Sequence, residues 1–269
     1  MTRDGLGMRL TVSILCALVL LSACGQVEEL RSARLEQATE FNQRAQRAFL
    51  RGDYQTAAAF YESALQLDVA IENVDGVAIN TLNLAKVYQV LGKTAPAQRL
   101  LDRLLEDKAL QYAPARLAEA AAQKSLWRLQ ENDLAGATLW ADKAAVWCES
   151  DCRISGVIDN VRAGIALRGN DAEKALHWSE RAAAANRDMP LEYANALRLM
   201  GAARLMKGEH DAALRLAEEA LAIDKSLGLP EKIRQDLLLA AQVHERTGHA
   251  GQAAQYRDRA ARIAAAAVK

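Results

Sequence analysis

The sequence has few aromatic residues, few prolines and no excess of either charge. Phe, Trp and Tyr together make up 5% of the 269 residues, and only 4 residues are Pro. This scarcity of aromatic and strand-forming residues disfavours sandwiches, barrels and parallel-sheet enzymes. The 34 basic residues balance the 34 acidic ones, so no net field attracts nucleic acid, and we expect no nucleic-acid partner. Ala, at 55 residues, gives high helix propensity, and an all-α fold is predicted.

Sequence motifs for catalysis or metal binding are also missing. The chain has no G-x-S-x-G, no Walker loop and no G-x-G-x-x-G. His244 and His249 resemble a zincin pair, but five residues turn a helix by about 500°, which places them on different faces. We therefore expect no enzymatic activity, no metal and no dissociable cofactor.

The N-terminal residues have the pattern of an export signal. The apolar run 10–21 follows Arg3 and Arg9 and is shorter than the roughly 20 residues that span a bilayer. Leu21-Ser22-Ala23-Cys24 resembles the bacterial lipobox, in which small residues admit the signal peptidase and the Cys receives diacylglycerol. An ordinary cleaved signal with a chance Cys is the alternative, and Met8 is an alternative start to Met1.

The lipobox resemblance implies a bacterial lipoprotein with a covalent lipid on Cys24. Residues 1–23 would be the signal peptide, and 24–37 a lipidated N-terminus with a helical extension. Acyl chains on Cys24 would anchor the chain firmly to a membrane. In that family an Asp after the Cys is associated with inner-membrane retention, and here the residue is Gly25. The resemblance therefore implies the periplasmic face of the outer membrane.

Two further cysteines, Cys148 and Cys152, would remain in this oxidising compartment. Helical positions i and i+4 lie about 6 Å apart, near the upper limit for a disulfide, and a frayed helix end would relax the strain. A disulfide is favoured, and two free, partly buried thiols are the alternative.

One sequence motif recurs six times between residues 38 and 269. It consists of an Ala-rich amphipathic run, a Gly or Asn-Asp break, and a second run with an early Ala. The breaks fall near residues 52, 92, 132, 170, 208 and 248. Five residues after each break stands an Ala, namely Ala57, Ala97, Ala137, Ala175, Ala213 and Ala253. Small residues let paired helices approach closely, and Gly or Asn tolerates the left-handed conformation that ends a helix. Each copy of the motif therefore predicts a helical hairpin.

The first copy of the motif resembles the tetratricopeptide repeat in the residues Gly52-Asp53-Tyr54, Ala57, Tyr61 and Ala64. Such repeats stack into a right-handed α-α superhelix, so the resemblance implies a solenoid of about six hairpins over 38–269. Pro114, Pro190 and Pro230 support this register, because all three fall between hairpins, where Pro can begin a helix. A long helical bundle without regular stacking is the alternative.

The tetratricopeptide family usually binds ligands along the first helices of its hairpins, on the concave side. The family register assigns Asn160, Asn195, Arg198 and Gln242 to that face. Amides can bond a peptide backbone and Arg can hold carboxylates. We expect Asn160, Asn195 and Arg198 to converge on one patch that faces solvent until a partner binds. A solvated helix face without a ligand is the alternative.

Three tryptophans, Trp140, Trp147 and Trp178, lie on second helices, the convex side in this family. They fit either a core or an exposed partner-binding strip. Taken together, the sequence predicts an outer-membrane lipoprotein scaffold that binds an envelope protein or peptide during envelope assembly, secretion or pilus biogenesis. A periplasmic chaperone-like receptor for extended peptides is the alternative.

Overall fold

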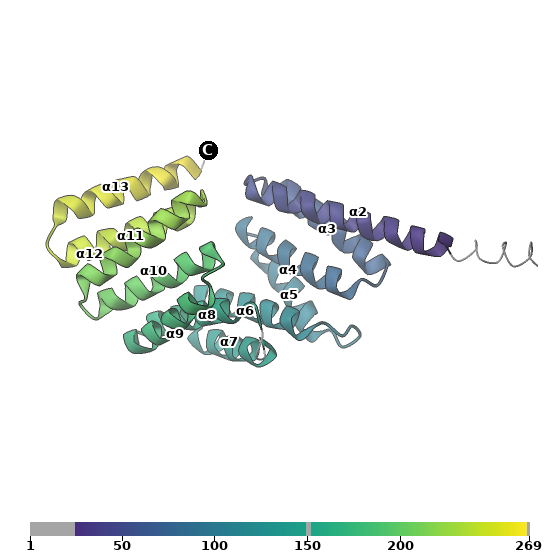
Figure 1. Ribbon diagram of the computed structural model, residues 1–269, viewed down its shortest axis with the longest axis horizontal. Helices are drawn as coiled ribbons and strands as arrows, with labels where there is room; N and C mark the ends of the chain where they lie inside the picture. The colour runs from purple at the N-terminus through teal and green to yellow at the C-terminus, as the bar shows by residue number, and fades with distance from the viewer. Residues whose placement is uncertain (1–24, 149–151, 268–269) are drawn as a thin grey trace, which may run out of the picture. The chain divides into compact units, whose positions relative to one another are not determined.

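The computed structural model describes residues 25–148 and 152–267, which form twelve α-helices and no strand (Figure 1). Cys24 and the predicted signal lie outside the described residues. No helix in the described part of the chain is long and apolar enough to cross a membrane. The helices are α2 (Gly25–Leu50), α3 (Tyr54–Ala70), α4 (Val74–Val90), α5 (Thr94–Glu106), α6 (Pro114–Gln130), α7 (Leu134–Cys148), α8 (Ser155–Arg168), α9 (Ala172–Ala185), α10 (Pro190–Met206), α11 (His210–Ser226), α12 (Pro230–Arg246) and α13 (Ala250–Ala267).

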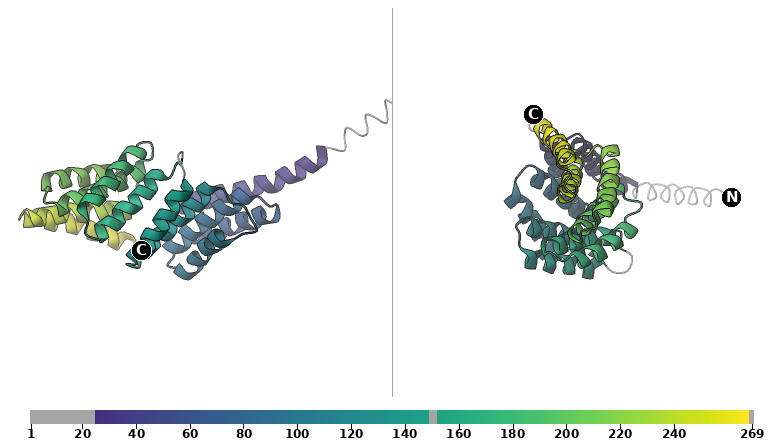
Figure 2. Two further views of the ribbon diagram at one scale, coloured as in Figure 1. Left: turned by 90° about the horizontal axis from the view of Figure 1, so that it is seen from below. Right: turned by 90° about the vertical axis from the view of Figure 1, so that its left-hand side faces the viewer.

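Consecutive helices pair into six hairpins, α2 with α3 through α12 with α13 (Figure 2). The chain divides into two compact units at Tyr112 and Ala113. Unit 1 contains the hairpins α2–α3 and α4–α5, and unit 2 contains the other four. The predicted all-α fold of helical hairpins is confirmed, with two hairpins in unit 1 and four in unit 2.

The six predicted breaks share one backbone geometry. Each break residue has a positive φ, between 60° at Asn170 and 79° at Gly52. After each break, the next backbone N–H donates to the carbonyl oxygen five residues earlier, as from Asp53 to Ala48 at 3.0 Å and from Glu209 to Arg204 at 2.9 Å. This bond satisfies a carbonyl group at the helix end, which the helix itself leaves unpaired. The left-handed turn is thus what separates the two helices of every hairpin.

Small side chains form the interface within each hairpin. The six Ala residues placed five positions after the breaks are all buried, from 0% exposure at Ala57 to 3% at Ala253. Because these side chains end at Cβ, the helix axes can approach closely. Pro114, Pro190 and Pro230 begin α6, α10 and α12, where a missing N–H costs no helical hydrogen bond.

Candidate partner-binding surface

Arg198 lies in a buried ion cluster in unit 2, and its predicted exposure to solvent is wrong. Its side chain, on α10, is 12% exposed. Nε donates to Oδ1 of Asp236 on α12 at 2.5 Å, and Nη2 donates to Oδ2 of Asp224 on α11. Both carboxylates are 0% exposed. The guanidinium therefore joins three helices, because two buried carboxylates need a cation near them.

The predicted convergence of Asn160, Asn195 and Arg198 does occur, through Glu192. Asn160 Nδ2, on α8, donates to the backbone oxygen and to Oε2 of Glu192, at 2.9 and 3.1 Å. Asn195 Nδ2 donates to the same Oε2 at 3.1 Å, while its Oδ1 accepts from Arg198 at 2.8 Å. Asn160 itself is buried. The amide nitrogens of Asn160 and Asn195 are therefore engaged with Glu192 and are not free to donate to a peptide backbone.

Lys232 on α12 completes the cluster, and Nζ donates to Asn195 Oδ1 at 2.8 Å. Burial lowers the pKa of Lys232, and the nearby Arg198 lowers it further. Burial also raises the pKa of Asp236, to about 6, although Arg198 opposes this. The term "buried ion cluster" below means Arg198, Asp224, Lys232 and Asp236. Arg198 and Lys232 thus supply two positive charges beside Asp224, Asp236 and the nearby Glu192.

The sequence prediction missed Asp224, Lys232 and Asp236. A signal for them was present, because Asp224 and Asp236 lie 26 and 38 residues after Arg198, and Asp68 and Asn80 lie 26 and 38 residues after Asn42. Gln242 on α12 is exposed and belongs to none of the described contacts of the cluster. Of the four predicted partner-binding residues, Gln242 is exposed, Asn195 and Arg198 are partly buried, and Asn160 is buried.

The outer face of α7 carries exposed apolar side chains. Leu139 is 54% exposed and Val146 is 76% exposed. Trp140 is half-buried between them in sequence, and the Nζ atoms of Lys124 and Lys143 lie 4.0 and 4.2 Å from its ring centre. The tryptophan is therefore neither fully core nor fully exposed. We call Leu139 and Val146, which are seven residues apart and so lie on one side of the helix, the α7 face.

A cavity of about 470 Å³ lies beside α7, between α7, α8 and α9. Leu134 and Ile165 contribute apolar lining, and Trp178 forms part of the wall. The guanidinium carbons of Arg162 and Arg181 lie 4.6 and 4.9 Å from the Trp178 ring centre. Arg162 also pairs with Asp142, Nη2 to Oδ1 at 2.8 Å. Apolar walls with paired charges at the margin are usual for surfaces that contact protein.

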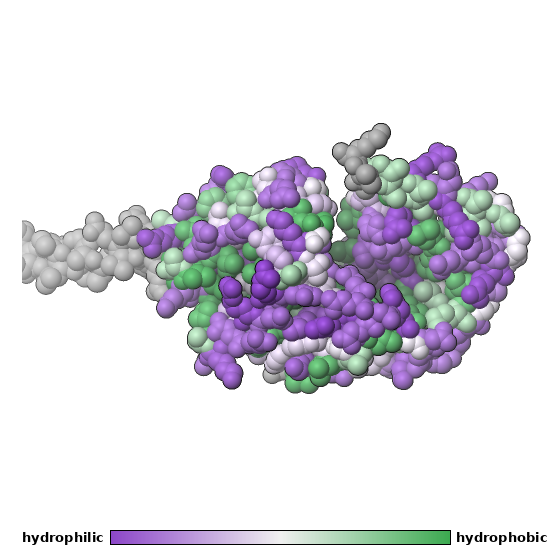
Figure 3. Space-filling view, turned by 180° about the vertical axis from the view of Figure 1, so that it is seen from behind, coloured by the Kyte–Doolittle hydropathy of each residue, from purple (hydrophilic) through white to green (hydrophobic). Residues whose placement is uncertain are grey.

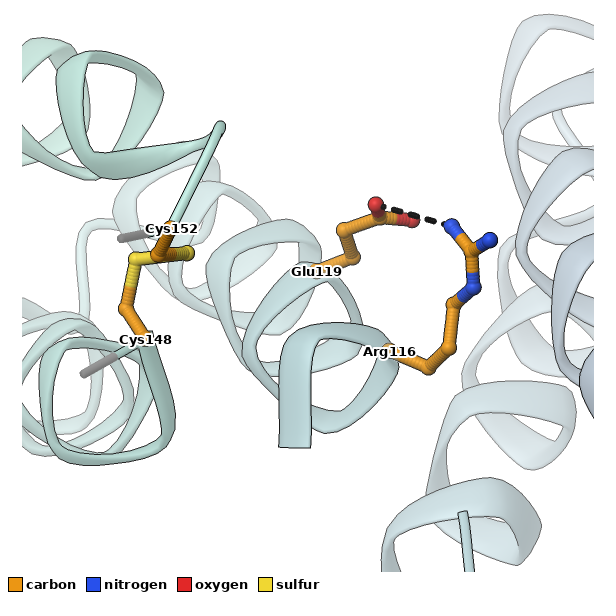
Figure 4. The surroundings of a disulfide bond; sticks show 4 residues. All are labelled: Arg116, Glu119, Cys148 and Cys152. Carbon is orange, nitrogen blue, oxygen red and sulfur yellow. Dashed lines mark hydrogen bonds and ion pairs between the residues drawn. A yellow bond between two sulfur atoms is a disulfide. The ribbon is translucent and has the colours of Figure 1, made fainter. Parts of the chain in front are cut away.

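Cys148, the last residue of α7, forms a disulfide with Cys152, and their Cα atoms are 5.0 Å apart (Figure 4). On the neighbouring α6, Arg116 Nη1 pairs with Glu119 Oε1 at 3.2 Å (Figure 4). The disulfide joins the end of α7 to the segment that leads into α8, where the chain passes from the third hairpin to the fourth.

Elsewhere the surface is mixed. On the face shown in Figure 3, hydrophilic side chains predominate and hydrophobic ones lie scattered among them. Scattered exposed apolar residues are normal for a folded protein. The α7 face differs because two large, exposed apolar side chains lie on the same side of a single helix.

No family model matches the chain, and no curated protein matches it. Several solved structures are similar to the chain. PilW, a type IV pilus biogenesis factor, is 20% identical with a TM-score of 0.59, over 81% of this chain and 90% of that one. BtubC from P. vanneervenii is 19% identical with a TM-score of 0.53, over 88% and 91%. A Rap protein complexed with Competence and Sporulation Factor is 12% identical with a TM-score of 0.62, over 87% and 65%.

These similarities concern the fold. They show that the chain has a helical-repeat fold of the tetratricopeptide type, in agreement with its six hairpins and repeated left-handed turns.

Proposed function

We propose that the chain is a scaffold that binds another protein of the bacterial envelope and is held by lipid on Cys24 at the periplasmic face of the outer membrane. The observation that carries the binding role is the α7 face, with Leu139 and Val146 exposed to 54% and 76%. Burying such side chains against a partner is favourable by roughly 25 cal/mol per Å². The lipobox Leu21-Ser22-Ala23-Cys24 supports the anchor.

The similarity to PilW supports a role in envelope assembly, including pilus biogenesis or secretion. PilW is a pilus biogenesis factor, and the alignment covers most of both chains. A scaffold of this kind acts by binding, so the proposal includes no catalytic step and no dissociable cofactor.

A peptide receptor is the second candidate, and the similarity to a Rap protein complexed with Competence and Sporulation Factor favours it. Its predicted donors, however, are already engaged: Asn160 and Asn195 bond Glu192, and Arg198 bonds Asp224 and Asp236. Gln242 is the predicted concave residue that stays exposed. A folded partner on the α7 face is therefore the better-supported function.

Site-specific photo-crosslinking in intact cells tests the choice between these two functions. A photoreactive residue at Val146 should capture a defined envelope protein, whereas one at Gln242 should not. The captured protein is then purified and titrated against variants of the chain. Val146→Asp should weaken binding about tenfold or more, since that factor corresponds to about 1.4 kcal/mol.

Val90→Asp is the matched control, because Val90 on α4 is also exposed, at 51%, and lies outside the α7 face. It should leave the affinity unchanged. If the crosslink forms at Gln242 and not at Val146, the concave receptor is the correct function and the scaffold proposal is wrong.

A further inference from the structure

Unit 1 contains a second copy of the positions that form the buried ion cluster, four repeats earlier. Adding 156 to residue numbers 42, 68, 76 and 80 gives 198, 224, 232 and 236. One of the two acids is retained, as Asp68 in place of Asp224, and the other, Asp236, is replaced by Asn80. Both cations are replaced by shorter residues, Arg198 by Asn42 and Lys232 by Gly76.

Asp68 is as deeply buried as its counterpart, at 2% exposure. Asn80 Nδ2 donates to its Oδ2 at 2.6 Å, and Asn73 Nδ2 donates to its Oδ1 at 2.7 Å. Asn42 Nδ2 in turn donates to Asn80 Oδ1 at 2.6 Å. A carboxylate has about four acceptor positions, so these two amides leave part of its capacity unused.

A cavity of about 220 Å³ lies beside Asn42, which stands at the position of Arg198 in the other copy. It is lined by Asn42, Asp68, Gly76 and Asn80, and also by Asp75. Among the lining residues that the structure describes, two are acidic and none is basic. Burial raises the pKa of Asp68, and the charge of Asp75 adds to this effect. The cavity thus combines acidic walls with a short side chain at the position that Arg198 holds in the other copy.

We propose that this cavity, the Asp68 pocket, binds the guanidinium group of an arginine side chain on a partner protein. The buried ion cluster shows the mode of binding inside the same chain, because Arg198 contacts the counterpart of Asp68 and also Asp236, the counterpart of Asn80. A planar guanidinium can donate to several oxygens at once, which a single ammonium group does with less directionality. The inference deepens the proposed scaffold function and rests on it.

A titration with a small arginine compound tests the pocket directly. The full chain in detergent is titrated with N-acetylarginine methylamide, while the side-chain amide NMR signals of Asn42 and Asn80 are followed. We expect saturable shifts of both signals. The citrulline analogue has the same shape without the charge, and it should give none. Equal shifts with citrulline, with the lysine analogue or with magnesium chloride would overturn the guanidinium assignment.

Asn42→Arg provides a second test, because it places an internal guanidinium where Arg198 lies in the other copy. This variant should melt at a higher temperature and bind the arginine compound at least about tenfold more weakly. Asn42→Gln, which lengthens the side chain without adding charge, should still bind. Unchanged binding by Asn42→Arg would overturn the proposal.

The same variant separates this inference from the proposed scaffold function. If wild type binds the arginine compound and crosslinking at Val146 captures no envelope protein, the scaffold proposal fails and the pocket assignment stands. If Asn42→Arg binds the captured partner with wild-type affinity, the scaffold stands and the partner's arginine does not occupy the Asp68 pocket.

Discussion

Arg198 on α10 holds Asp236 on α12, with Nε 2.5 Å from Oδ1, while the same guanidinium also contacts Asp224 on α11. A residue that the sequence assigns to ligand binding is therefore a connection between the fifth and sixth hairpins. Its loss would affect stability before it affected any partner.

Arg198→Ala should lower the free energy of unfolding by about 3–5 kcal/mol, because Asp224 and Asp236 lose the guanidinium that both carboxylates contact. Urea unfolding followed by circular dichroism measures this change. Arg234→Ala is the matched control, since Arg234 forms an exposed i,i+3 pair with Glu231 at 2.7 Å. It should cost about 0.5 kcal/mol or less. Equal effects of the two substitutions would contradict the buried ion cluster.

The stability contributed at Asp236 should fall as the pH rises. Burial raises its folded-state pKa to about 6, above an unfolded value near 4, although Arg198 and Lys232 favour the charged form. The folded state then binds more protons than the unfolded state between about pH 4 and 6, so deprotonation disfavours folding in that range. Asp236→Asn should therefore gain stability relative to wild type as the pH rises through this interval, as measured by melting temperature.

Glu231→Gln should show the opposite sign and a smaller effect. The hydrogen bond from Arg234 lowers the pKa of Glu231, so the charged carboxylate stabilises the fold above its unfolded pKa. Wild type should gain stability relative to this variant as the pH rises through about 4. A pH-independent difference between Asp236→Asn and wild type would contradict the assignment for Asp236.

Gly208→Ala should destabilise the chain by about 1–2 kcal/mol, because φ is 78° at this position and a Cβ disfavours that region. The cost is purely conformational, since an added Cβ would meet nothing within 4 Å. Gly251→Ala is the matched control: its added Cβ is also free of contacts, but it lies in helix α13 without a positive φ. That change should instead stabilise by about 0.5–1 kcal/mol. Thermal unfolding that moved both variants in the same direction would contradict this account of the turns.

Cys24→Ala should abolish incorporation of labelled fatty acid and release the chain from the outer-membrane fraction. The reason is that the thiol of Cys24 is the proposed attachment point for the lipid. Labelling in cells followed by membrane fractionation measures both effects. Cys16→Ala, which changes a cysteine before the proposed cleavage point, should leave labelling intact. Normal labelling of the Cys24 variant would refute the anchor.

The fold could be predicted from the sequence because its determinants are local. The positive φ at each break favours Gly or Asn, and close helix packing favours Ala five residues later. Both residues therefore recur at regular intervals in the sequence. The buried ion cluster is harder to predict from the sequence. Whether Arg198 meets solvent or a carboxylate depends on Asp224 and Asp236, which come from two other helices. The repeat register assigns each residue to a face of its own helix, so it does not show which residues of other helices contact it.

The carboxylate of Asp224 is shared, because it accepts from Arg198 of its own hairpin and lies against Asp236 of the next one. Asp236 has its countercharge, Arg198, in the preceding hairpin, so the charge at this junction is balanced only when these two hairpins follow one another. Replacing the sixth hairpin with a copy of the second would substitute Gly76 for Lys232 and Asn80 for Asp236 at the junction. The hairpins are thus not interchangeable. The polar residues at each junction must match those of the adjacent hairpin, and this requirement restricts the order of the hairpins along the chain.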